Sequence, residues 1–358
     1  MKKIFVSAAK IQQSKFNFRC LLLLFTLSVV YCLLSIVSCY AQDIHFSQFN
    51  RSPLNLNPAN TGFFDGDYRF TGIHRNQWKS VTVPYKTFSG SFDMTTPFPH
   101  SENNLIGAGI VFNNDKAGDS EFGILEGALS TSLIKNIGKD SVHVLSAGIQ
   151  LGFVQQSINY ANLTFDSQYD GDAFIPGSSN YETFSDNNFI YFDLSAGVNW
   201  LFRINKKFNL SVGASLFHIN KPKLSFMSDA TSKLNPKVAI NVNCSIAVTE
   251  NLFVLPALLY QNQFKYKELD AGGNLKFILN KKPGKYIALY GGLWLRPKDA
   301  VYPSIGLDFN ELNVGFSYDI NTSDLNRASD SKGAYEISLT YIIKKVKPLV
   351  VHPPCPVY

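Results

Sequence analysis

The sequence has few cysteines and offers no disulfide framework. Five of its 358 residues are cysteine, and Cys20, Cys32 and Cys39 fall within the first 41 residues. Only Cys244 and Cys355 lie beyond them, and their positions have no metal-ligand spacing. A small disulfide-stapled protein and a cysteine-based zinc site are therefore excluded.

An excess of one charge sign is also absent once residues 1–41 are set aside. That stretch carries five of the 33 basic residues and none of the acidic ones, so 28 basic residues remain against 27 acidic residues. The net charge of the remainder is therefore about +1. A nearly neutral chain indicates neither a nucleic acid nor an acidic substrate as its partner.

One long apolar run occurs, Leu21–Val37, and it follows five basic residues. This order is typical of an export signal, and Cys39-Tyr40-Ala41 offers small residues just before Gln42. We predict a cleaved signal peptide over residues 1–41. Two alternatives stay open: an uncleaved anchor, because the run is longer than a usual signal core, and a lipoprotein, because Ile36-Val37-Ser38-Cys39 loosely resembles a lipobox.

Catalytic and metal-binding motifs are missing. The sequence contains no Gly-x-Ser-x-Gly, His-Glu-x-x-His or P-loop, and its six histidines are scattered. Residues 166–174 (DSQYDGDAF) start like a calcium loop, with Asp166, Asp170 and Gly171 in place. Gly177 stands where the bidentate glutamate is needed, so an outer polar loop is the preferred interpretation. We predict no enzyme activity, no catalytic residue, no cofactor and no metal ion.

The chain does have alternation at period two, in segments of about ten residues separated by turn residues. From Phe189 to Arg203, for example, apolar side chains such as Ile190 and Val198 alternate with polar or small ones such as Asp193 and Asn199. Fourteen such segments are predicted as strands: 66–75, 84–93, 103–113, 121–133, 141–154, 188–203, 207–217, 236–249, 251–261, 265–279, 285–296, 300–309, 311–320 and 333–344.

A soluble β-sandwich also alternates, so further features have to decide. The segments reach the roughly 9–11 residues that a tilted transmembrane strand needs. Their polar faces carry residues suited to a hydrated lumen, and aromatic residues such as Trp200 and Trp294 lie near strand ends, as in an interfacial girdle. The residues expected to point inward include Asp193, Asn241, Asp270 and Lys276.

Short turns alternate with long polar connections. The predicted connections on one side are mostly tight, whereas those on the other side include 155–187, 218–235 and 321–332. We therefore predict an all-β fold, a transmembrane antiparallel barrel of about 14 strands over residues 66–345 of an outer-membrane protein. Both termini, including a tail over 346–358, are expected on the periplasmic side.

Residues 42–65 precede the first predicted strand and have no periodicity. Pro53 and Pro58 exclude a central strand, and Asn57 can form an Asx-turn. One interpretation is a simple turn, followed by a girdle with Trp78 at the headgroup level. The other is a plug inside the barrel lumen, whose amides and asparagine side chains meet lumenal charges. The sequence leaves both open.

The block FSQF…PLNLNPANTG…DYRFTGIHRNQW resembles the N-terminal hallmark of the PorP/SprF family of Bacteroidota outer-membrane proteins, and the end YEISLTYIIKK with its tail resembles family endings. Ser52 departs from the pattern, which usually has asparagine before Pro53-Leu54. The matching residues that we take as motif and plug candidates are Phe46, Ser47, Gln48, Asn57, Pro58, Ala59, Gly62, Arg75, Gln77 and Trp78.

The resemblance implies a non-enzymatic component or partner of the type IX secretion and gliding-motility apparatus. Its expected partners are outer-membrane lipid, a large secreted adhesin, and periplasmic and outer-membrane secretion components. Such proteins support export or surface anchoring of adhesins, or link the outer membrane to periplasmic machinery. A FadL-like transporter of hydrophobic small molecules remains an alternative, although the inward residues are too polar for an apolar route. A soluble secreted β protein is the third hypothesis.

Overall fold

A computed structural model describes residues 43–79, 83–99, 101, 104–138, 142–175, 178, 186–205, 207–224, 226, 232–282, 284–323 and 326–344. The predicted signal peptide, the predicted C-terminal tail and Gly177 lie outside these residues. The unit that contains the barrel begins at Ile44.

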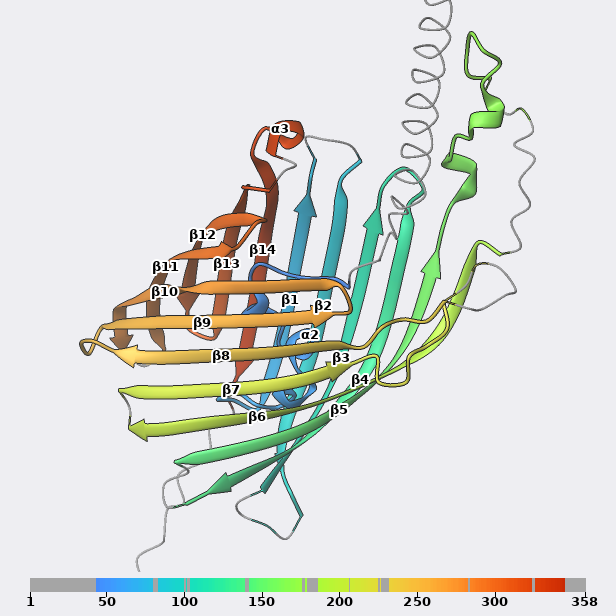
Figure 1. Cartoon of the computed structure of the whole chain (residues 1–358). Coiled ribbons are helices and arrows are strands. Elements are labelled where there is room, and N and C mark those ends of the chain that lie inside the picture. Colours follow the sequence, from blue (N-terminus) through green and yellow to red (C-terminus); the bar gives the residue numbers. More distant parts are fainter. Residues whose placement is uncertain are drawn as a thin grey trace, which may run out of the picture. The chain divides into compact units, whose positions relative to one another are not determined.

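Fourteen antiparallel strands form a closed barrel, in which each strand pairs with its neighbours in sequence and β1 pairs with β14 (Figure 1). The predicted fold class is therefore confirmed. The strands are β1 (Tyr68–Gln77), β2 (Tyr85–Pro97), β3 (Asn104–Ala117), β4 (Phe122–Ile137), β5 (His143–Ser157), β6 (Asn188–Asn205), β7 (Phe208–Phe217), β8 (Lys237–Ala247), β9 (Leu252–Gln263), β10 (Tyr266–Lys282), β11 (Lys285–Arg296), β12 (Ala300–Phe309), β13 (Leu312–Asn321) and β14 (Lys332–Ile343).

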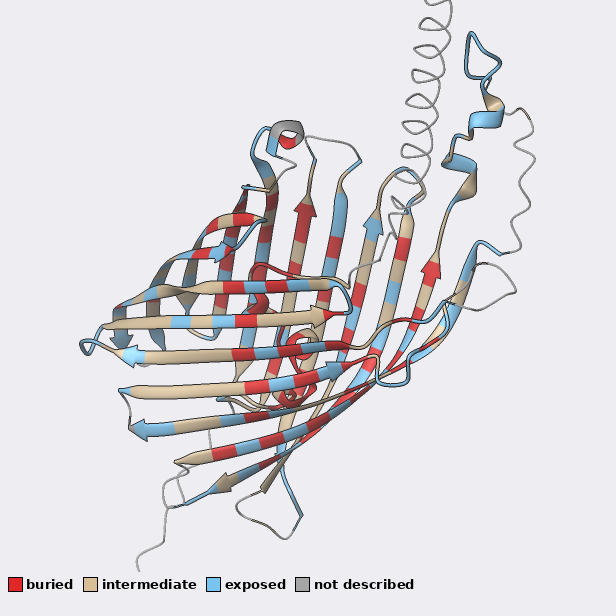
Figure 2. Ribbon diagram, in the orientation of Figure 1, coloured by how far each residue is buried: buried red, intermediate tan, exposed pale blue. Residues whose placement is uncertain are grey.

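Alternation along each strand separates a polar lumen from an apolar outer surface. In β6, Asp193 and Asn199 are buried inside the barrel, whereas Ile190 and Val198 are exposed outside it. The same banding of buried and exposed residues runs along the other strands in Figure 2. Asn241 and Asp270 are likewise buried. Apolar side chains that face outward are what a surrounding bilayer requires.

Trp294 corrects the girdle prediction. Its indole is buried inside the barrel, while Leu293 and Leu295 on either side of it are exposed. Trp294 shares the inward face of β11 with Arg296, because the two positions differ by two residues. A position near a strand end therefore did not reveal which way the ring points. Trp200, in contrast, lies on the same face as the exposed Val198.

Several strands are longer than predicted. β2 continues to Pro97 and β3 to Ala117, whereas the alternation predicted ends at residues 93 and 113. Ladder pairing goes on where the apolar alternation fades, as in the pairs Lys86↔Lys116 and Thr87↔Asp115. The backbone ladder does not need apolar side chains, so a strand can continue beyond the part in which apolar and polar residues alternate.

The two mouths of the barrel differ in their connections. The short-turn mouth holds the start of β1, the end of β14 and the connections 98–103, 138–142, 206–207, 248–251, 283–284 and 310–311. The long-connection mouth holds the connections 78–84, 118–121, 158–187, 218–236, 264–265, 297–299 and 322–331.

The helices of the described residues are all short. They are η1 (Phe49–Arg51), α2 (Pro53–Leu56), η2 (Pro58–Asn60), η4 (Tyr160–Asn162), η5 (Asp166–Gln168) and α3 (Asn326–Ser329). None of these described helices has the length and apolar character needed to cross a bilayer.

Candidate functional site: the lumenal segment

Residues 44–65, which we call the lumenal segment, run through the inside of the barrel, where α2 is surrounded by strands (Figure 1). Pro53 and Pro58 open α2 and η2, at helix positions where the missing N–H group costs nothing. A helix of four residues is not stable by itself. The contacts that hold this segment must therefore come from the barrel wall.

Asn57 joins the segment to two strands. Its Oδ1 accepts the N–H of Ala59 at 2.9 Å, which confirms the expected Asx-turn. Its Nδ2 donates to the carbonyl of Val198 in β6 at 3.0 Å and to that of Ala214 in β7 at 3.4 Å. The side chain is fully buried, so each of these bonds satisfies a polar group that water does not reach.

Glycines make this close approach possible. We call Gly107 (β3), Gly148 (β5), Gly197 (β6) and Gly213 (β7) the glycine wall. A Cβ atom at any of these four positions would lie within 3.0 Å of an atom of the lumenal segment, closer than real Cβ contacts occur. At Gly197, for example, the nearest atom is Oδ1 of Asn57. The segment therefore lies directly on the backbone of the wall, with its own backbone at Gly107 and Gly148 and with the side chain of Asn57 at Gly197 and Gly213.

Serine hydroxyls between these glycines satisfy the carbonyls of the segment. Ser132 donates to the carbonyl of Thr61 at 2.5 Å, and Ser146 donates to that of Ala59 at 2.7 Å. Ser215 donates to the carbonyl of Leu56 at 2.9 Å. Irregular backbone without a ladder partner is tolerated at membrane depth only when such groups pair with it.

The end of the segment is fixed by Asp93 of β2. Gly62 has φ +66°, a left-handed conformation that favours glycine, and its N–H donates to Asp93 Oδ2 at 2.7 Å. Arg69 of β1 makes a two-pronged contact with the same carboxylate, at 2.9 and 2.7 Å. Arg69 also donates to the carbonyl of Asn60 at 2.9 Å, so one buried ion pair holds two backbone groups of the segment.

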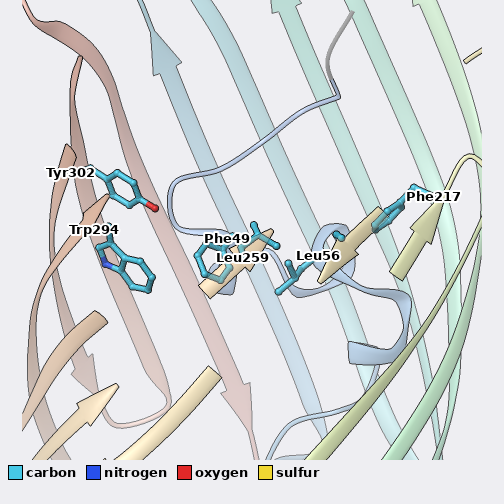
Figure 3. Close-up of a cluster of buried hydrophobic side chains, with 7 residues drawn as sticks. Phe49, Leu56, Phe217, Leu259, Trp294 and Tyr302 are labelled. Carbon is cyan, nitrogen blue, oxygen red and sulfur yellow. The ribbon is translucent and has the colours of Figure 1, made fainter. Parts of the chain in front are cut away.

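Apolar side chains of the segment pack against the opposite wall. Phe49 meets Trp294 edge to face, with ring centroids 5.5 Å apart. Figure 3 shows Phe49 and Leu56 projecting from the segment among side chains of the wall. The wall members of this cluster are Phe217 (β7), Ala239 (β8), Leu259 (β9), Trp294 (β11) and Tyr302 (β12). An apolar cluster inside a polar lumen stabilises the docked segment by removing these rings from water.

Charged side chains gather around the start of the segment. We call Arg75 (β1), Glu268 and Asp270 (β10), Arg296 (β11), Asp319 (β13) and Glu336 (β14) the charged cluster, and all six are buried. Arg75 pairs with Glu336 at 2.5 Å and with Asp319 at 3.0 Å. Arg296 pairs with Asp270 at 2.9 Å and approaches Asp319 at 3.5 Å. Two guanidinium groups thus face four carboxyl groups.

Ser47 and Gln48 supply further donors to these carboxyl groups. The N–H of Ser47 donates to Glu336 Oε1 at 2.6 Å, and that of Gln48 donates to Glu336 Oε2 at 2.8 Å. The hydroxyl of Ser47 lies 2.8 Å from Asp319 and accepts from Arg75 at 2.8 Å and from Arg296 at 3.0 Å. Buried charges are costly unless they are paired and hydrogen-bonded, so the docked segment and the charged cluster stabilise each other.

His45 and Arg51 are two basic residues of the segment. Burial lowers the pKa of His45 to about 4; the charge of Glu268 opposes this shift, and those of Arg75 and Arg296 add to it. His45 is therefore neutral at neutral pH. The guanidinium of Arg51 lies 5.6 Å from the centroid of the Tyr290 ring, within range of a cation–π contact.

The ten candidate residues from the sequence fall into two groups. Phe46, Ser47, Gln48, Asn57, Pro58, Ala59 and Gly62 belong to the lumenal segment, and Arg75 meets that segment at Ser47. Gln77 accepts a hydrogen bond from Arg75 at 3.3 Å. Trp78 lies apart from them, beyond the end of β1, where its ring packs edge-on against Tyr85 at 5.2 Å.

Sequence reasoning missed the partners of the segment on distant strands. Arg296, Asp319 and Glu336 were not singled out, although Glu336 stands on the polar face of a predicted strand, in phase with Ser338. A buried charge on a lumenal face is a usable signal. The glycine wall gives a second one, because its glycines also occupy lumenal positions.

One cavity lies beside the segment, and it is small. A cavity of about 40 Å³ is lined by residues 47–51 of the segment and by wall side chains that include Tyr290, Trp294 and Tyr302. A benzene-sized ligand occupies a cavity of roughly 150 Å³, whereas one water needs roughly 10–15 Å³. Among the described residues, no three His, Cys, Asp or Glu side chains come together to hold a metal ion. The arrangement is suited to holding a peptide segment.

Solved structures similar to this chain are bacterial barrels. The Ralstonia pickettii toluene transporter TbuX is 11% identical, covering 81% of this chain and 92% of its own, with a TM-score of 0.48. The Pseudomonas putida toluene transporter TodX is 8% identical over 81% and 93%, with a TM-score of 0.46. CdiB from Acinetobacter baumannii is 11% identical over 77% and 60%, with a TM-score of 0.41. Similarity this low carries no inference about a ligand.

No curated protein matches the chain. A protein family does match: the family described as "Type IX secretion system membrane protein PorP/SprF" matches residues 38–341, which include the lumenal segment and nearly all of the barrel. The resemblance of the N-terminal block is thereby confirmed, and the chain belongs to the PorP/SprF family of type IX secretion system membrane proteins.

Proposed function

We propose that this protein is a non-enzymatic scaffold of the type IX secretion and gliding-motility machinery in the outer membrane. In this role it supports export or surface anchoring of a large adhesin, or links the membrane to periplasmic components. Family membership gives the association with secretion. The occupied lumen is the observation that favours a scaffold over a channel.

The contacts of the lumenal segment support a fixed plug. Hydrogen bonds or ion pairs reach the segment from strands far apart around the barrel, including β2, β4, β7 and β14. Moving the segment would leave the carboxyl groups of Asp93 and Glu336 without several of their donors inside the barrel. A plug held in this way suits a protein whose outer surface and connections bind partners while its lumen stays closed.

The FadL-like alternative requires a route for hydrophobic molecules. The lumen instead presents buried charges and a cavity of about 40 Å³. A molecule of the size of toluene or a fatty acid does not fit this space unless the segment moves. Uptake of a fluorescent fatty acid by proteoliposomes, above that of a protein-free control, would favour the transporter.

The proposal includes an orientation in the envelope. Residues 1–41 act as a cleaved export signal, the barrel spans about residues 66–345, and the tail 346–358 reaches the periplasm. The long-connection mouth then faces the cell exterior, where the connection 158–187 is available to a secreted protein. Short inner turns and long outer connections are the usual arrangement of bacterial outer-membrane barrels.

The direct test combines a gene deletion with a pull-down. Deletion should deplete a surface adhesin or other secreted cargo, and wild-type complementation should restore it. Detergent pull-down of the tagged protein, followed by mass spectrometry, should recover that cargo or components of the secretion machinery. Normal secretion and motility, together with a pull-down that contains neither, would refute the proposal.

A further inference from the structure

The two ends of the lumenal segment lie at opposite mouths of the barrel. Its beginning is bonded to Asp319 and Glu336, near the end of β13 and near the start of β14. Both of these strand ends belong to the long-connection mouth. His45 lies close enough to Asp299, in the connection 297–299 of the same mouth, for that carboxylate to act on its ring.

The far end of the segment reaches the short-turn mouth. Thr61 accepts from Ser132 in the last part of β4, and the N–H of Gly62 donates to Asp93 in the last part of β2. Just beyond the segment, the N–H of Asp67 donates to the carbonyl of Ile343 at the end of β14 at 2.9 Å. These strand ends all belong to the short-turn mouth.

From this path we infer that the chain threads its own barrel: it enters at the long-connection mouth, descends through the lumen and leaves at the short-turn mouth to begin β1. The N-terminal side of the barrel unit therefore opens toward the long connections, and its C-terminal side, at Lys344, opens toward the short turns. This path differs from the expectation that both termini share one side of the membrane, because it puts the two ends of the barrel unit at opposite mouths.

The bonds at the entrance give this direction a physical basis. Residues 45–48 meet the charged cluster, in which four carboxyl groups exceed two guanidinium groups. Backbone N–H groups of Ser47 and Gln48 add two donors to Glu336, beside the one that Arg75 of the wall supplies. If the segment ran in the opposite direction, Ser47 and Gln48 would face the glycine wall instead of the charged cluster. The glycine wall, however, fits Asn57, Pro58 and Thr61 at the depth that they occupy now.

The consequence is that Ile44, the start of the barrel unit, and the connection 158–187 belong to the same mouth. In that connection Tyr169, Phe174 and Ile175 are exposed. With the orientation proposed above, a protein that binds the N-terminal side of this chain has to approach from the cell surface. The threading itself does not depend on that orientation, because it only relates one mouth to the other.

Accessibility of short epitope tags tests the threading. One tag is inserted between Asp43 and Ile44, a second after Gly171 in the long connection, and a third after Lys344. Antibody binding is compared on intact and permeabilised cells, and heat-modifiable migration on gels confirms that each barrel is folded. The first tag should react under the same conditions as the second and under opposite conditions to the third.

A second accessibility experiment uses single cysteines, which change the chain less than an inserted tag does. Asp43→Cys, Gly171→Cys and Lys344→Cys are placed separately in a background with Cys244→Ser and Cys355→Ser, and a membrane-impermeant maleimide replaces the antibody. Labelling of position 43 together with 171, and opposite to 344, supports threading. Labelling of position 43 from the side of 344, or from neither side, overturns it. Secretion is not measured, so the outcome is independent of the proposed function.

Discussion

The glycine wall and the charged cluster hold the same segment by opposite means. At the glycine wall, the wall contributes no side chains at the four glycines, and atoms of Asn57 to Thr61 lie directly against the strand backbone. At the charged cluster, long side chains reach across the lumen to Ser47 and Gln48. The glycine wall holds the segment because its glycines carry no side chain, and the charged cluster holds it because its buried charged groups are paired.

This contrast determines how each region should respond to mutation. The glycine wall tolerates no added atoms, since a Cβ there would overlap the segment. The charged cluster tolerates no lost partner, since a buried carboxyl group without its guanidinium keeps the full cost of leaving water. A side chain added at the glycine wall should therefore displace the segment. Removal of a charged side chain from the charged cluster should destabilise the folded protein.

The largest expected effect follows the loss of Arg296. Arg296→Gln should lower the free energy of unfolding by about 3–5 kcal/mol, because Asp270 and Asp319 lose a buried cationic partner. Urea unfolding in detergent micelles measures this change. The matched control is Lys332→Gln, whose partner Asp330 is exposed; it should cost less than about 1 kcal/mol. Equal effects of the two variants would mean that burial adds nothing to the ion pairs of the charged cluster.

A smaller effect is expected from Gly197→Val. The new side chain overlaps Asn57, so the segment should leave the wall at a cost of about 1–3 kcal/mol, while the strand ladders remain. Limited proteolysis should then cut within residues 44–65 although the barrel keeps its heat-modifiable migration. Gly127→Val is the control, because nothing lies within 4 Å of a Cβ at that position. Cleavage of both variants at the same rate would show that the glycine wall is not specific for the segment.

Features set by neighbouring residues could be predicted from the sequence, whereas features set by contacts between residues far apart in the chain could not. The period-two pattern identified all fourteen strands, because a lipid-facing side and a lumenal side impose alternation on each strand separately. The location of the lumenal segment could not be decided, since its bonds join Ser47 to Glu336 and Asn57 to Val198 across most of the chain. The inward face of Trp294 was misjudged for a related reason, because its partner Phe49 is remote in sequence.

The third prediction separates hydrogen bonding from packing at the glycine wall. Asn57→Ala keeps the close approach of the segment backbone to Gly107 and Gly148 but removes the Asx-turn and the bond to Val198, so a loss of about 1–2 kcal/mol is expected. Asn50→Ala, at an exposed position of the same segment, is the control and should change little. If urea midpoints of both variants match that of the wild type, the fit of the glycines alone would hold the segment.

The smallest effect concerns pH and the charged cluster. His45 has a pKa of about 4 in the folded protein against 6.5 when solvated, so the unfolded chain binds more protons between these values. Its contribution to stability is complete above pH 6.5 and falls as the pH drops toward about 4. Arg75, Arg296, Glu268 and Asp299 all act on this ring, and His45→Gln leaves them in place.

Between about pH 6.5 and 5.5 the wild type should therefore lose about 1 kcal/mol more than His45→Gln in urea unfolding. Taking the difference between the two proteins removes the titration of the carboxyl groups that they share. Parallel pH profiles would place His45 in water at the long-connection mouth, away from the charged cluster. A steeper loss for the wild type would instead show that His45 is enclosed beside the charged cluster in the folded protein, so that protonating its ring in acid costs stability.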